Sequence, residues 1–179
     1  MADLTHRDVV VVGGANTDYL VRGKKLPRQG ETVEGDVFQY AAGGRGVNQA
    51  VAAARMGARV AFVGRVGNDD RGDQIIRELD REGIDTTFIS RTDRRPTGAA
   101  LVMVDENGDK QIQIAPGANH DMTLEDVERA AGAIRSAKVL LTQLEIPVNV
   151  VEAALTIADE NATKTILDPA PGQPLEHAF

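Results

Sequence analysis

The chain has 179 residues, of which 42% are hydrophobic and 26% are charged, so it is long enough for one globular domain and too ordinary in composition for a disordered or fibrous protein. It carries 20 lysines and arginines against 27 aspartates and glutamates, and the net charge of −7 argues against a generic nucleic-acid or anionic-membrane surface. The absence of cysteine excludes thiolate catalysis, and three histidines leave little for a histidine metal site.

The remaining composition favours a small ligand. No stretch has the roughly 18 consecutive apolar residues that span a bilayer, and residues 1–8 lack an apolar signal segment. Aromatic residues make up only 3%, so nucleic-acid bases would find few stacking partners. We therefore expect a cytoplasmic protein that binds a small polar molecule, with no nucleic-acid and no membrane partner.

The first half of the chain alternates apolar runs with amphipathic segments. Residues 8–12 form an apolar run closed by Gly13, as in a strand that is buried on both faces of a parallel sheet. Apolar residues then recur at spacings of three and four from Gly46 to Gly57, which predicts a helix with a glycine stop. Three further elements continue the alternation: a strand over 59–63, a helix over 70–82 and a strand over 87–91.

Two stretches interrupt this alternation. Residues 32–40 are rich in valine and aromatic residues, and residues 97–115 contain two apolar runs separated by a turn at 106–108. Both are typical of an antiparallel flap. Thr123 then begins a helix with Asp126 at its third position, a variant of the capping box. The α/β pattern resumes with a strand over 139–144, a helix over 147–160 and a strand over 165–167, so the predicted fold class is α/β, with a doubly wound, mostly parallel sheet and a small antiparallel β-sheet.

Asn16 and Asp18 follow the first predicted strand directly. Ligands of open α/β sheets collect at the carboxyl ends of strands, where an aspartate can accept hydrogen bonds from two neighbouring hydroxyls. The same residue types favour an Asx turn, and position alone does not choose between the two interpretations.

The segment from Gly43 to Ala50 is a glycine turn that leads into a helix. Backbone N–H groups at such a helix start can meet ligand oxygens. The alternative is an ordinary helix entry with Arg45 in solvent. Gln49 occupies the place of the third glycine or alanine of a dinucleotide fingerprint, which makes a nicotinamide oxidoreductase a distant hypothesis.

These motifs carry a family resemblance. The segments GGANTD (13–18), PRQGET (27–32) and GGRGVNQA (43–50) resemble, in order and spacing, the amino-terminal half of the ribokinase-like (PfkB-type) carbohydrate kinases. The match continues over nearly the whole chain, through residues 64–72, 97–99, 116–119, 143–145 and 168–171. The resemblance implies a large α/β domain and a small β-sheet lid, with lid segments at about 17–40 and 97–115 and the sugar between the two parts.

The resemblance also implies a sugar site with a polar and an apolar part. Asn16 and Asp18 would hold sugar hydroxyls, and Glu145 would close the pocket. The other polar positions are Gly43, Gly44, Arg45 and Asn48, and the apolar lid positions are Ala100, Val102 and Ile114. Strand alternation alone would make the three apolar residues ordinary core. Arg45 stands where the family is expected to carry lysine, so a planar fork replaces a point charge and the sugar preference stays open.

The second half of the family pattern is missing from this sequence. It lacks the G-A-G-D segment that supplies the base and anion hole, and it lacks the asparagine–glutamate motif linked to magnesium. We therefore expect residues 1–179 to be the N-terminal part of one ribokinase-like domain, without its nucleotide-binding part and inactive alone. For the intact protein the resemblance implies ATP and Mg²⁺, with a monovalent cation as a further option. We also expect homodimerisation through the lid, because residues 32–40 and 97–115 would otherwise expose a valine-rich sheet with open edges. The implied reaction is phosphorylation of a sugar, with ribose giving ribose 5-phosphate. A nucleoside kinase, a hexose-phosphate kinase and a non-catalytic sugar-binding or dimerising fragment are the alternatives.

Overall fold

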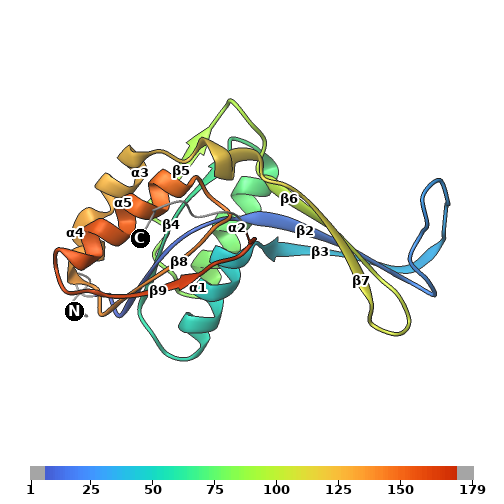
Figure 1. The fold of residues 1–179 in the computed structure, drawn as a ribbon, viewed down its shortest axis with the longest axis horizontal. Helices are drawn as coiled ribbons and strands as arrows, with labels where there is room; N and C mark the ends of the chain where they lie inside the picture. The colour runs from blue at the N-terminus through green and yellow to red at the C-terminus, as the bar shows by residue number, and fades with distance from the viewer. Residues whose placement is uncertain (1–6, 173–179) are drawn as a thin grey trace.

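The computed structural model describes residues 7–172, which form an α/β domain and a second, smaller sheet. Figure 1 shows the small sheet projecting from one end of the layered domain. In chain order the elements are β1 (Val9–Val12), β2 (Asn16–Gly23), β3 (Gly35–Gly43), α1 (Arg45–Arg55), β4 (Val60–Gly67), α2 (Asp70–Arg81), β5 (Ile89–Thr92), β6 (Gly98–Val104), β7 (Lys110–Ala115), the 3₁₀ helix η1 (Gly117–Asp121), α3 (Leu124–Arg129), α4 (Ala131–Ser136), β8 (Val139–Gln143), α5 (Val148–Asp159) and β9 (Lys164–Asp168).

The main sheet has the strand order β5-β4-β1-β8-β9, and all of its pairings are parallel. Its central strand β1 is buried on both faces. Val10 and Val12 pack in the core beneath α3, α4 and α5, whereas Val11 packs in the core beneath α1 and α2. Helices therefore cover both faces of the sheet, which confirms the predicted doubly wound α/β class.

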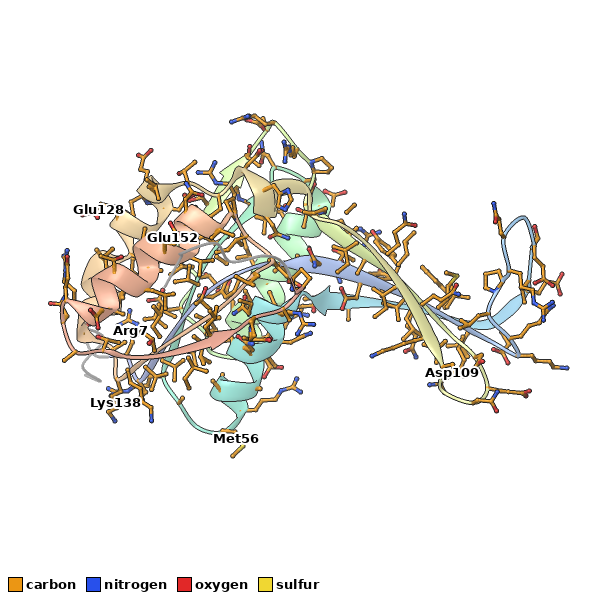
Figure 2. The ribbon with its side chains drawn as sticks, in the orientation of Figure 1. Arg7, Met56, Asp109, Glu128, Lys138 and Glu152 are labelled. Atoms are coloured by element: carbon orange, nitrogen blue, oxygen red, sulfur yellow. The ribbon has the colours of Figure 1, made fainter. Side chains whose placement is uncertain are left out.

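The smaller sheet, called the lid below, has the order β3-β2-β6-β7. The pairings β2–β3 and β6–β7 are antiparallel, as expected, but β2 pairs with β6 in parallel, so the sheet is mixed. Asp109 lies at the far tip of the β6–β7 hairpin (Figure 2). The lid begins close to the main sheet, because β2 starts at Asn16 shortly after β1 ends.

Helix starts follow the local signals in the sequence. Asp69 caps α2, and its carboxylate accepts the Gly72 N–H at 2.8 Å. Thr123 and Asp126 form the capping box of α3. Gly44 precedes α1 with a φ of 86°, a conformation that glycine adopts without a steric penalty.

Two local details differ from what the sequence suggests. Of the two interpretations of Asn16 and Asp18, the Asx turn does not apply: both are residues of β2, and each has a partner on both neighbouring lid strands. The strand predicted at 87–91 lies at Ile89–Thr92, where it pairs with the end of β4. Across residues 7–172 no helix is both long and apolar enough to cross a membrane.

Candidate functional site

Asp18 lies against a glycine at the point where the lid joins the main domain. A methyl group on Gly43 would be 2.1 Å from Asp18 Oδ2, so only glycine allows the carboxylate to occupy this position. The N–H of Gly44 donates a hydrogen bond to the same carboxylate. The glycine turn therefore brings backbone to Asp18.

Glu145 reaches the same helix start from the end of β8. Its Oε2 accepts the backbone N–H of Arg45 at 2.8 Å, and its side chain is only 8% exposed. The Arg45 guanidinium extends past this carboxylate, with Nε 3.8 Å from Glu145 Oε1 and Nη1 3.0 Å from Asp168 Oδ2. We call Asn16, Asp18, Gly43, Gly44, Arg45 and Glu145 the candidate site.

Three backbone N–H groups at the start of α1 are engaged by the protein itself, contrary to the expectation that they are free for ligand oxygens. The N–H of Gly44 meets Asp18, that of Arg45 meets Glu145, and that of Val47 donates to the Gly14 carbonyl at 3.3 Å. A helix N-terminus that already faces two carboxylates is a poor site for a phosphate group.

Burial raises the pKa of both carboxyl groups. For Asp18 the loss of hydration outweighs the opposing hydrogen bond from Gly44. For Glu145 burial again dominates, the N–H and the charge of Arg45 oppose it, and the neighbouring charges of Asp18 and Asp168 add to the increase. Glu145 and Asp168 thus share the Arg45 guanidinium, and Asp18 adds a third carboxylate near Glu145. This arrangement suits a neutral molecule that donates hydrogen bonds, such as a polyol.

Asn16 is held from behind by a residue that the sequence interpretation did not assign. Asn119 donates to Asn16 Oδ1 at 2.8 Å and accepts the Ala15 N–H at 2.9 Å, and both asparagines are 1% exposed. Because the bond uses Asn16 Oδ1, the amide nitrogen is left as the donor toward a ligand. The only sign of this role in the sequence was the match of residues 116–119 to the family pattern.

Two of the three predicted apolar lid residues share the register position of Asp18. Asp18 pairs with Ala100, and Ala100 pairs with Ile114, so all three lie on one face of the lid. Ala100 is 5% exposed and Ile114 is 43% exposed. Val102 follows two residues along the same strand and face.

Among the described residues, Asn48 makes no hydrogen bond to the site carboxylates. It is on the first turn of α1, is exposed, and lines a hollow of about 770 Å³ between α1 and α2 together with Ala41 and Glu78. The structure thus brings together the predicted site residues on β2, the glycine turn and the end of β8, whereas Asn48 faces this hollow.

The described residues include no cluster of side chains suited to a metal ion. Within residues 7–172 no three His, Asp or Glu side chains converge as metal ligands, and the start of α1 is occupied by carboxylates. ATP, magnesium and a monovalent cation therefore stay expectations from the family resemblance, and no residue of this chain is assigned to them.

Comparison with known proteins gives a consistent picture. A family model described as "pfkB family carbohydrate kinase" matches residues 6–179. Ribokinase from Mus musculus is 42% identical over 163 residues, which cover 91% of this chain and 50% of that protein. Ribokinase from Haemophilus influenzae is 39% identical over 167 residues, which cover 93% of this chain and 55% of that protein.

A solved structure has a similar fold. Arabidopsis thaliana ribokinase in complex with ribose and ATP superimposes with a TM-score of 0.78 at 34% identity, covering 92% of this chain and 54% of that one. The chain therefore spans about half the length of the curated relatives it matches.

Proposed function

Because this chain belongs to the pfkB family of carbohydrate kinases, we propose that it supplies the sugar-binding part of an ATP-dependent kinase that converts ribose to ribose 5-phosphate in the cytoplasm. Relatives named ribokinase and the ribose complex of the Arabidopsis protein support this choice. The observation that carries it is the convergence of the Asp18 and Glu145 carboxylates on the start of α1.

In this proposal the chain binds and orients the sugar. The two oxygens of Asp18 accept hydrogen bonds from adjacent hydroxyls, and the amide nitrogen of Asn16 donates to a third oxygen. Gly43 leaves room for the Asp18 carboxylate to take this position. Ala100 and Ile114 cover the carbon face of the ring and keep water away, which strengthens the hydrogen bonds beneath it.

The charge of the site separates this proposal from one alternative. A hexose phosphate would bring a further negative charge to a site where the carboxylates of Asp18, Glu145 and Asp168 already outnumber Arg45. A neutral pentose avoids that repulsion. A nucleoside is also neutral, so the nucleoside kinase hypothesis is separated from ribokinase by experiment rather than by charge.

The test is ADP formation by the full-length gene product with ribose, 2-deoxyribose, adenosine and fructose 6-phosphate. We expect turnover with a pentose and none with the phosphorylated sugar. No turnover with ribose or any related polyol would contradict the proposal. Calorimetric titration of the same protein with ribose then separates a sugar-binding module, which binds without turnover, from a protein that neither binds nor reacts.

We also propose that the lid mediates homodimerisation. Its strands expose large apolar side chains, which water-facing sheets of monomers avoid. They include Val21, Phe38, Leu101 and Ile112, which are 39% to 62% exposed. Light scattering of the full-length protein should give the mass of a dimer at micromolar concentration, and a monomer under those conditions would contradict the proposal.

A further inference from the structure

A third carboxylate borders the candidate site at the end of β9. Asp168 is the last residue of that strand, and its Oδ2 accepts hydrogen bonds from Arg45 Nη1 at 3.0 Å and from Gln49 Nε2 at 3.3 Å. Pro169 follows, and a proline keeps the preceding residue in extended backbone. The Asp168 carboxylate is therefore held facing α1.

The Gln49 amide is fixed from its buried side. Gln143 at the end of β8 is fully buried and donates through Nε2 to Gln49 Oε1 at 2.6 Å. Since Gln143 uses the oxygen of Gln49, the nitrogen of Gln49 is directed to Asp168. A hydrogen-bonded chain thus runs from Gln143 through Gln49 to Asp168 and ends on Arg45.

This chain sets the position of the Arg45 guanidinium relative to Glu145. Nη1 of Arg45 is engaged by Asp168, whereas Nε stays 3.8 Å from Glu145 Oε1, beyond hydrogen-bond distance. An arginine that lost Asp168 would close on Glu145, because a carboxylate and a guanidinium prefer two parallel hydrogen bonds. The pair would then occupy carboxylate oxygens that a ligand needs.

We propose that Asp168 is a positioning residue of the sugar site, which holds Arg45 back from Glu145 so that the Glu145 carboxylate can accept sugar hydroxyls. This inference rests on the proposed function and extends it to a residue that does not touch the sugar. It also gives arginine a role that lysine cannot fill equally, since a planar fork reaches two carboxylates and a point charge does not.

The test compares Asp168→Asn, Arg45→Lys and the double variant in the full-length enzyme, using ribose KM, kcat and calorimetric affinity. Asp168→Asn should raise KM about tenfold and leave kcat within about threefold, because the defect is in binding. In the Arg45→Lys background the same change should alter KM less than about threefold, because Asp168 acts through the arginine. Glu82→Gln is the matched control: it removes the partner of Arg55, another arginine of α1, and should leave KM unchanged.

The pH dependence of ribose affinity provides a second measurement, which would not change if Asp168 had a purely structural role. Glu145 faces Asp18 from β2, Arg45 from α1 and Asp168 from β9. Removing the Asp168 charge and pairing Arg45 with Glu145 both lower the pKa of Glu145. The loss of ribose affinity at acidic pH should therefore shift to lower pH in Asp168→Asn.

The outcomes are distinct. A parent enzyme that phosphorylates ribose while Asp168→Asn keeps the parental KM and pH profile overturns this inference and leaves the function standing. Additive effects of Asp168→Asn and Arg45→Lys also overturn it. A parent that neither binds nor phosphorylates any sugar overturns the proposed function and this inference with it.

Discussion

Replacing Gly43 by alanine tests the geometry of the site directly. The added methyl group would lie 2.1 Å from Asp18 Oδ2 and 2.3 Å from Asp18 Cγ, whereas an ordinary contact is 3.4 Å or more. The carboxylate must therefore move by about 1 Å, and a displacement of that size costs on the order of 100-fold in rate. We expect Gly43→Ala to lower kcat/KM for ribose about 100-fold, which corresponds to about 2.7 kcal/mol.

The assay is steady-state ADP formation by the full-length gene product, with ribose affinity measured by calorimetry. Overpacking should cost about 1–3 kcal/mol of stability, which urea unfolding will register without abolishing the fold. Gly132→Ala is the control, because a methyl group there meets no atom within 4 Å and the residue lies in α4. It should keep the parental affinity.

A double variant identifies the route of the effect. If Gly43→Ala acts by displacing Asp18, it should cause little further loss in an Asp18→Ala background. If the losses in kcat/KM from Gly43→Ala and Asp18→Ala multiply in the double variant, the methyl group blocks the sugar itself. Parental ribose affinity in Gly43→Ala would refute the assignment of Asp18 to the sugar.

The remaining predictions concern single carboxylates and one amide. Asp18→Ala should weaken ribose binding and turnover severely, since each hydrogen bond to a carboxylate is worth about 1.5–3 kcal/mol. Asn48→Ala should have a milder effect. Kinetic constants within about threefold of the parent for Asp18→Ala would contradict the role of Asp18 in holding sugar hydroxyls. Glu145→Gln should raise the melting temperature at pH 8 while weakening ribose binding. Burial raises the pKa of Glu145, so the contribution of this carboxyl group to stability is present below the unfolded pKa of about 4.3 and is lost as the pH rises through the folded pKa. Equal melting temperatures of variant and parent at all pH values would argue against this. Asp126→Asn should cost about 3–5 kcal/mol in urea unfolding at pH 7, because it leaves Arg65 without its buried partner. Burial opposes ionisation of Asp126, but the hydrogen bonds from Ser90 and Arg65 outweigh this effect and hold its pKa below the usual range. The parent should therefore lose this stabilisation only as the pH falls through that lowered pKa. A variant as stable as the parent at pH 7 would contradict the assignment.

Elements with local start and stop signals were predicted well. The capping box at Thr123 and the glycine stop at Gly57 depend on neighbouring residues alone, so the sequence shows them. Strand β4 runs to Gly67, beyond the predicted 59–63. The prediction stopped short because Gly64 and Arg65 interrupt the apolar run. Arg65 is tolerated in the strand because Asp126 pairs with it at 2.9 Å, a contact between residues 61 positions apart.

The same limit applies to the site. Asp18 and Glu145 belong to motifs that are readable along the chain, but the roles of Asn119 and Asp168 depend on partners more than 100 residues away. Spacing carries no information about such pairs. Nor could it show that β2 pairs in parallel with β6, since hairpin signals predict only the antiparallel pairings.

The parallel seam between β2 and β6 has a consequence for the order of folding. Each half of the lid is a pair of strands adjacent in the chain, β2 with β3 and β6 with β7, which can form early because they close short loops. The seam joins strands separated in sequence by β3, α1, β4, α2 and β5, so it closes only after the main domain has brought its two ends together. The lid thus consists of two hairpins that pair with each other late in folding. In partial unfolding, the β2–β6 pairing should open before either hairpin does.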